Sequence, residues 1–153
     1  RDLDLLAADA ADRLAAMLQP DDALVVVAAE APCKTAAMLA RNVQMMASIC
    51  AALERCPCRY VLYVSSDAVY ADEPVPLTEQ SNAAPGSLHG LMHLAREAML
   101  RDAVSGSLGI LRPTLVYGAG DPHNGYGPNR FLRLALVPTL AECRRAAELL
   151  AAG

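Results

Sequence analysis

The sequence predicts an α/β fold built around a doubly wound parallel β-sheet. Short apolar runs rich in β-branched or aromatic residues, as expected of strands buried on both faces, occupy residues 23–29, 60–65 and 106–111. Helical patterns separate these runs, and the connections are long enough for the crossovers that parallel pairing requires. In such sheets ligands bind beyond the carboxyl ends of the strands, so we expect functional residues directly after each run.

Most elements are bounded by a start or stop signal in the sequence. Pro20 closes the first helical pattern, and a Cys-Pro-Cys breaker centred on Pro57 closes the second. Ser87 is the predicted N-cap of the third, and Pro113 ends the last apolar run. The predicted order is helix 3–18, strand 23–29, helix 35–55, strand 60–65, helix 88–103, strand 106–111, and helical patterns at 131–137 and 139–152.

Composition and charge narrow the class of protein. With 153 residues, 54% of them hydrophobic, the chain is long enough for one domain with a sizeable core. A net charge of −4 without any Lys/Arg run argues against a nucleic-acid partner or an anionic membrane surface. No continuous apolar run reaches the ~18 residues of a membrane span. The chain begins Arg-Asp-Leu-Asp, without Met or a leader pattern, so we expect a fragment of a longer cytoplasmic protein.

The five cysteines support the same location. Their number is odd and their spacing fits no disulfide framework, which predicts reduced thiols. Cys56 and Cys58 form the one close pair, but a zinc site would need two further ligands at a matching spacing. No metal is therefore expected there.

Several motifs occur together in one order. They are Val-Leu-Tyr-Val-Ser-Ser-Asp-Ala-Val-Tyr at 61–70, Leu-Arg-Pro-Thr-Leu-Val-Tyr-Gly at 111–118, and Asn42 with Val43 in the helix behind the first strand. Over residues 22–136 this combination resembles the NAD-dependent epimerase/dehydratase family of extended short-chain dehydrogenases/reductases, many of which act on nucleotide sugars. The resemblance implies a Rossmann-like fold, NAD or NADP as cofactor, a sugar-type small-molecule substrate and hydride transfer.

The glycine-rich cofactor turn of that fold is missing from the chain. Such a turn needs glycines for its tight bend and for close approach of the pyrophosphate, and no glycine precedes Gly86. Gly118 and Gly120 begin a similar pattern, but His123 stands in place of its third glycine. We therefore expect an incomplete sheet at residues 1–136 that lacks the first βαβ unit and most of the substrate lobe. Residues 137–153 are expected to form a helical tail without family pattern.

The resemblance also implies catalytic positions. Ser66 stands where the family places the hydroxyl that hydrogen-bonds the reacting substrate oxygen, although Ser65 and Ser66 could instead simply terminate a strand. The family's Tyr-x-x-x-Lys is replaced by His89-Gly-Leu-Met-His93, and the single lysine is Lys34.

Three interpretations of the histidine pair stay open. The first makes His89 the acid/base and lets His93 hydrogen-bond ribose hydroxyls. The second is a relative that only binds dinucleotide, and the third is a structural helix face. A metal bound by His89, His93 and Glu97 would lack a further ligand.

The remaining site residues are also carried over from the resemblance. The predicted cofactor contacts are Ala28, Ala29, Asn42, Pro113 and Thr114, and the predicted substrate contacts are Asn129 and Arg130. Each type also has a structural interpretation: small residues let helix and sheet approach, Pro113 terminates a strand, and a surface arginine is often only solvated.

The expected function is that of a domain resembling NAD(P)-dependent epimerases, dehydratases and reductases. The alternatives are a non-catalytic dinucleotide-binding or regulatory relative, and an inactive truncated fragment. A homodimer through helices 35–55 and 88–103 is a further expectation.

Overall fold

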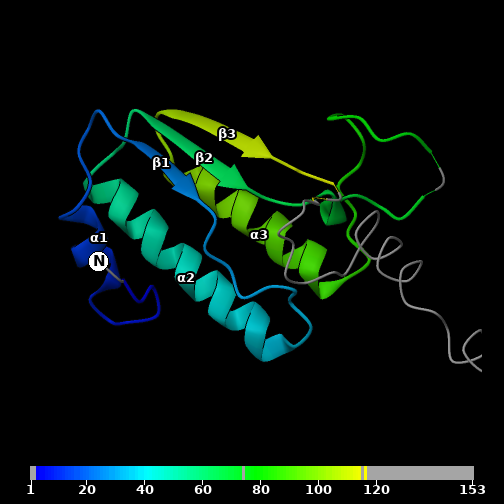
Figure 1. Ribbon diagram of the computed structural model, residues 1–153, viewed down its shortest axis with the longest axis horizontal. Helices are drawn as coiled ribbons and strands as arrows, with labels where there is room; N and C mark the ends of the chain where they lie inside the picture. Colours follow the sequence, from blue (N-terminus) through cyan, green and yellow to red (C-terminus); the bar gives the residue numbers. More distant parts are fainter. Residues whose placement is uncertain (1–2, 74, 115, 117–153) are drawn as a thin grey trace, which may run out of the picture. The chain divides into compact units, whose positions relative to one another are not determined.

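The computed structural model describes residues 3–73, 75–114 and 116, and it groups Arg1–Thr114 as one compact unit. It confirms the predicted α/β class (Figure 1). The elements in chain order are α1 (Ala10–Ala15), β1 (Ala23–Val26), α2 (Ala36–Arg55), β2 (Tyr60–Val64), the 3₁₀ helix η1 (Asp67–Val69), α3 (Leu88–Ala103) and β3 (Ser107–Leu111). The helices predicted at 131–137 and 139–152, and the boundary predicted at residue 136, lie outside the described residues.

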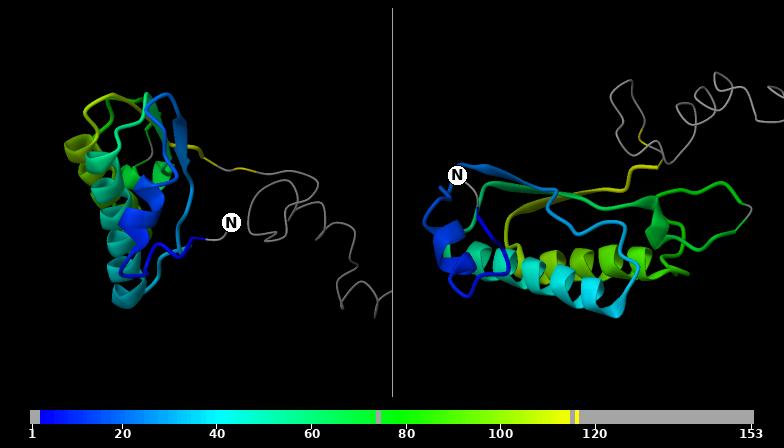
Figure 2. Two further views of the ribbon diagram at one scale, coloured as in Figure 1. Left: turned by 90° about the vertical axis from the view of Figure 1, so that its left-hand side faces the viewer. Right: turned by 60° about the horizontal axis from the view of Figure 1, so that its bottom comes forward.

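The sheet is parallel, with strand order β1-β2-β3. Val25 is opposite Leu62, and Leu62 is opposite Gly109. α2 and α3 return the chain between successive strands and pack against each other beneath one face of the sheet (Figures 1 and 2). Because every strand runs the same way, all three carboxyl ends lie at one edge of the sheet.

The core lies between the sheet and this helical layer. Alternate strand residues such as Val26, Val61 and Tyr63 point inward, and Met46 on α2 and Leu100 on α3 meet them from below. Full burial of an aliphatic side chain of this size stabilises a fold by roughly 1.5–3 kcal/mol. This packing determines how α3 lies beneath the sheet.

The expectation that the strands are buried on both faces is wrong for the described residues. Val25 is 53% exposed and Leu111 is 52% exposed. The reason is that α2 and α3 both cover the same face, so the described part forms one half of a doubly wound sheet. We call the uncovered side the open face. On it the Tyr60 ring lies against Gly109, where any Cβ atom would overlap the phenol oxygen.

Two elements are shorter than predicted. The strand predicted at 23–29 ends at Val26, because side chains of α3 and α2 bind the next backbone groups: Arg96 donates to the Ala28 carbonyl, and Asn42 holds the backbone of Glu30. The helix predicted at 3–18 is reduced to α1, which packs on α2. Helix α2 matches its prediction, with Thr35 accepting a hydrogen bond from the Met38 amide as N-cap.

Within the described part of the chain, α2 is the one helix long and apolar enough to span a membrane by length and composition, with a mean hydropathy of 1.3. Its sequence contains no long continuous apolar run, because Arg41, Asn42 and Gln44 interrupt the apolar residues. Core helices pass the same test, and α2 buries Met46, Ile49 and other residues of one side in the core. The test is therefore weak evidence here.

Candidate active site

Ser66 lies just beyond the carboxyl end of β2. The ladder between β2 and β3 continues past the strands, because the Ser65 amide donates to the Leu111 carbonyl at 2.8 Å and the Asp67 amide donates to the Pro113 carbonyl at 3.2 Å. Ser66 itself caps η1: its hydroxyl accepts from the Ala68 amide at 3.1 Å and donates to an Asp67 carboxylate oxygen at 3.2 Å. These contacts hold the hydroxyl at the carboxyl edge.

Gly90 brings the start of α3 against η1. Ser87 caps α3 by accepting from the Gly90 amide at 3.1 Å. Gly90 is buried so closely against the Ala68 carbonyl that a Cβ atom there would overlap it and crowd Pro85. His89, the neighbour of Gly90 in the first turn, therefore lies at the same edge as Ser66.

His89 is half-buried at this edge, where its Nδ1 accepts from the Cys33 amide at 3.4 Å. Burial lowers the pKa of His89, and the charge of Asp67 opposes that effect without reversing it. The side chain is therefore neutral at pH 7.

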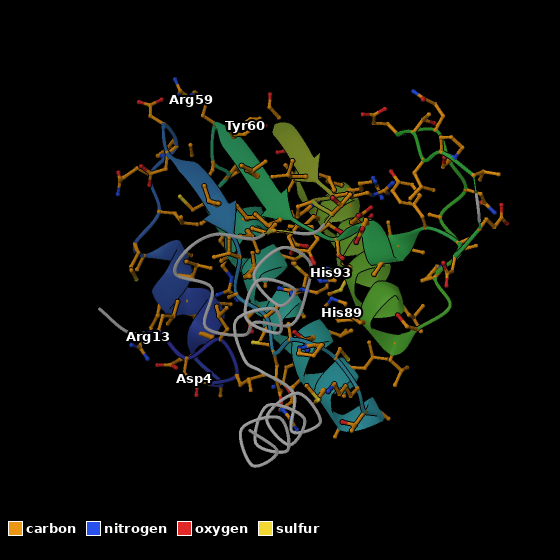
Figure 3. The ribbon with its side chains drawn as sticks, turned by 45° about the vertical axis from the view of Figure 1, so that its right-hand side comes forward. Asp4, Arg13, Arg59, Tyr60, His89 and His93 are labelled. Carbon is orange, nitrogen blue, oxygen red and sulfur yellow. The ribbon has the colours of Figure 1, made fainter. Side chains whose placement is uncertain are left out.

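His93 follows one turn later on α3 and is nearly enclosed, with 6% of its surface exposed. Its Nδ1 lies 2.7 Å from the Tyr63 hydroxyl, and its ring meets that of His89 edge-on at 4.7 Å between centroids (Figure 3). Burial lowers the pKa of His93 from 6.5 to about 4, helped by His89 and Arg96. The structure therefore brings the two predicted histidines together, and His93 carries no charge at pH 7.

Arg96 was not singled out from the sequence. It is fully buried, donates to the Ala28 carbonyl at 2.6 Å, and places its guanidinium 5.3 Å from the centre of the Tyr63 ring. Its Nε has no hydrogen-bond partner among the residues that the structure describes. The available signal was its position on the same side of α3 as His93 and Leu100, a side that otherwise indicates core.

Glu97 is also fully buried, and it joins α3 to the residues that follow β2 and β3. Arg112 binds it with two hydrogen bonds at 2.9 and 2.7 Å, and the Ser65 hydroxyl donates to it at 2.6 Å. Burial raises the pKa of Glu97, but the hydrogen bonds from Arg112 and Ser65 outweigh this, so its net pKa is lowered. Both oxygens are occupied, so Glu97 does not complete a metal site with the histidines. No cluster of three His, Cys, Asp or Glu occurs among the described residues.

The predicted cofactor contacts lie in different surroundings. Ala28 and Ala29 are exposed beyond the end of β1. Asn42 is fully buried: its amide donates to the Glu30 carbonyl at 3.0 Å and accepts from the Glu30 amide at 3.0 Å, so it holds the loop after β1. Asn42 is therefore placed to position the loop after β1 and does not itself face a ligand.

A groove with a volume of about 500 Å³ lies beside the end of β3. Thr114 is exposed within it, whereas Pro113 is half-buried and is not part of its lining. Polar groups of Asp67, Thr78 and Arg112 also line it. Asn129 and Arg130, the predicted substrate contacts, lie outside the described residues.

The described residues fit one part of a dinucleotide. Ala28 and Ala29 offer an exposed backbone with no side chain beyond Cβ, against which a flat group can lie, and two neutral imidazoles stand nearby on α3. A glycine-rich turn, which would hold the pyrophosphate, does not occur before Gly86 in this sequence. The described residues therefore fit a flat ring and a hydroxyl-bearing group better than a pyrophosphate.

A parallel α/β sheet with its polar residues gathered at the carboxyl edge is typical of nucleotide-binding α/β proteins. Residues 1–141 match the model of the "NAD dependent epimerase/dehydratase family". The chain belongs to this family, as the sequence motifs predicted. Among curated proteins, none matches the chain significantly.

Solved structures agree with this fold. A proposed epimerase from Burkholderia cenocepacia J2315 is 28% identical, with a TM-score of 0.69 over 82% of this chain and 42% of that one. A UDP-N-acetylglucosamine 4-epimerase from Methanobrevibacter ruminantium M1, in complex with UDP-N-acetylmuramic acid, is 24% identical, with a TM-score of 0.71 over 87% of this chain and 46% of that one. A UDP-glucuronic acid 4-epimerase from Bacillus cereus, in complex with NAD, is 22% identical, with a TM-score of 0.63 over 75% of this chain and 38% of that one. The last two show the fold. The chain thus spans less than half the length of these proteins.

Proposed function

We propose that this chain is part of an NAD(P)-dependent enzyme of the epimerase, dehydratase or reductase type that acts on a sugar-type substrate. The observation that supports the proposal is the packing of Gly90 on Ala68, which brings the start of α3, and His89 with it, to the same carboxyl edge as Ser66. A hydroxyl and an imidazole at one edge of the sheet can polarise a substrate oxygen and move its proton.

The bound nicotinamide would supply the hydride acceptor or donor. Ser66 turns its hydroxyl from Asp67 to the substrate oxygen. The rotation costs little free energy, because the Ser66–Asp67 hydrogen bond that it breaks is long, at 3.2 Å, and therefore weak. When the substrate is oxidised, its hydroxyl proton passes to a bare His89 Nε2, and the ring, with its own proton on Nδ1, becomes an imidazolium until it gives the proton back. Its Nδ1 accepts only a long hydrogen bond of 3.4 Å from Cys33, so the ring can change its protonated nitrogen at little cost.

Two further parts of the proposal concern substrate and location. Arg130 and Asn129 would contact the phosphate of a nucleotide sugar, which is supported by the sugar nucleotide bound to the Methanobrevibacter relative. A reducing, cytoplasmic location is supported by the four described cysteines, which are all free thiols.

A second candidate is a relative that binds dinucleotide without turnover. It is favoured by the neutral state of His93, whose pKa of about 4 leaves no cation at the position where the family has lysine. Without that cation a phenol or an alcohol at the site is harder to ionise.

One experiment separates the two candidates. NADH fluorescence is titrated with the full-length protein, and turnover of a panel of UDP-sugars is measured for wild type, Ser66→Ala and His89→Ala. We expect binding in all three, and a loss of turnover of roughly 10²-fold or more in each variant. The matched control is Ser105→Ala, an exposed serine before β3.

The other outcomes also bear on the two candidate functions. Binding with no turnover in wild type favours the second candidate. The absence of both binding and turnover in the full-length protein contradicts both.

A further inference from the structure

The hydrogen bond between Tyr63 and His93 is the shortest contact that either histidine makes among the described residues. Tyr63 is 1% exposed on β2, its side chain points toward α3, and its hydroxyl lies 2.7 Å from His93 Nδ1. A buried phenol must direct its proton to an acceptor, and a neutral imidazole has one bare nitrogen and one N–H. The direction of this bond therefore determines which nitrogen of His93 carries the proton.

The surroundings favour one direction. Burial raises the pKa of Tyr63 to about 12, so the phenol keeps its proton at pH 7. Two charged groups act on the phenol: Arg96 can only donate hydrogen bonds, and the carboxylate oxygens of Glu97 are already bound by Ser65 and Arg112. In the part of the chain that the structure describes, His93 Nδ1 is the acceptor that the phenol reaches. The phenol thus donates, Nδ1 is bare, and Nε2 carries the proton.

We propose that Tyr63 is a positioning residue that fixes His93 as the Nε2–H tautomer and so makes it a permanent, neutral hydrogen-bond donor. The ligand group it would take is an uncharged oxygen, such as a hydroxyl of a ribose or a sugar. That assignment of the ligand rests on the proposed function, whereas the tautomer does not.

The two histidines then have different roles. At 2.7 Å the Tyr63 bond holds His93 firmly, and at 3.4 Å the Cys33 amide holds His89 weakly. His93 is the fixed donor, and His89 keeps the freedom to exchange a proton. The lysine of the family motif is thereby replaced by a donor without charge.

Nitrogen-15 NMR of the histidine rings in the ligand-free full-length protein tests the tautomer. At pH 7 we expect the His93 Nδ1 resonance at the position of an unprotonated nitrogen and the Nε2 resonance at that of an N–H. In Tyr63→Phe, which keeps the ring beside Arg96 and removes only the hydroxyl, we expect both resonances to shift toward an average of the two tautomers. Tyr60→Phe is the matched control, since Tyr60 lies on the same strand at its opposite end (Figure 3).

A proton on Nδ1 in wild type, or unchanged His93 resonances in Tyr63→Phe, would overturn the proposal. The second measurement is NAD⁺ affinity. Tyr63→Phe should weaken it by about two- to tenfold, the value of one hydrogen bond, and Tyr60→Phe should leave it unchanged. If the predicted tautomer is found but wild type binds no dinucleotide, the proposed function fails while the role of Tyr63 stands.

Discussion

Glu97 and Arg112 form the ion pair that joins α3 to the carboxyl edge of the sheet. The Glu97 side chain is fully buried and that of Arg112 is 16% exposed. Breaking such a pair from one side leaves a charge without its partner in a poorly solvated place. The positions of Ser65 and Arg112 therefore depend on Glu97.

For Glu97→Gln we predict a loss of about 3 kcal/mol in the free energy of unfolding, measured by urea denaturation. The chain offers a matched control in Glu30→Gln. Glu30 also binds its arginine, Arg41, with two hydrogen bonds, but both side chains are about 40% exposed, at 39% and 43%. Solvent screening makes that pair a weak contributor. Equal losses in the two variants would contradict the assignment.

His93 predicts a pH dependence. Its folded pKa of about 4 lies below the ordinary 6.5, because of burial and then the charges of His89 and Arg96, opposed by Glu97. The unfolded chain therefore binds more protons between these values, and stability falls as the pH drops from about 6.5 to about 4, by at most about 3 kcal/mol.

The measurement is a series of urea titrations across this pH range on wild type and His93→Gln, in which we expect a flatter profile for the variant. The difference between the two proteins is read above pH 4.5, because the lowered pKa of Glu97 places its own loss of stability below that value. An unchanged profile in His93→Gln would show that another group is responsible.

Single residues differ in how far the sequence predicts them. The sequence pointed to Ser66 through a motif that resembles the family pattern and to His89 through the position of the family's Tyr-x-x-x-Lys, and their catalytic roles stay predictions. Tyr63 and Arg96 were not found, since each occupies an apolar position of its element, and only the fold brings a β2 phenol next to two α3 side chains. Asn42 was found by its motif, but the structure directs its amide to the Glu30 backbone.

At the level of elements, α3 and η1 depend on one glycine. For Gly90→Ala the added methyl group must displace the Ala68 carbonyl or Pro85, and we predict a loss of about 1–3 kcal/mol in unfolding free energy. Because His89 then moves away from Ser66, turnover should fall more than stability alone explains. Thermal denaturation and the UDP-sugar assay give the two values.

Gly86→Ala provides the comparison, because a Cβ atom at Gly86 meets nothing within 4 Å. It should leave both stability and turnover close to wild type. If Gly90→Ala behaves in the same way, close packing does not position His89.

The starts and stops of elements were predictable where a local signal decides them. Thr35 and Ser87 cap their helices as N-caps should, and β3 ends before Pro113. β1 ends early for a reason that no local pattern contains, since Arg96 lies 68 positions further along the chain than the carbonyl it binds. This long-range hydrogen bond explains why the predicted end of the first strand was wrong.

On the scale of the whole molecule, the described part exposes several large apolar side chains on and around β1. Val25 and Val27 on and after β1 are 53% and 65% exposed, and Met17 nearby is 49% exposed. Together with Leu3 and Leu14 these residues line an apolar hollow of about 270 Å³. Contiguous apolar surface of this kind favours association. The homodimer predicted through residues 35–55 and 88–103 stays a prediction.

We predict that Val25→Thr with Val27→Thr lowers the binding of an apolar fluorescent dye by the 153-residue chain and reduces its self-association in size-exclusion chromatography. The free energy of unfolding should change little, because both side chains are already solvated. In contrast Val26→Thr, at a position 3% exposed, should cost about 1–3 kcal/mol for its buried hydroxyl. Undiminished dye binding in the double variant would place the apolar surface elsewhere.

The fit of Tyr60 over Gly109 makes the open face convenient for spectroscopy. The chain has no tryptophan, so Tyr60→Trp would introduce a single indole, and the missing side chain of Gly109 leaves room for it. Its emission would report on the sheet surface that α2 and α3 do not cover. A blue shift on adding a binding protein or a neighbouring segment would identify what covers that surface, without any assay of catalysis.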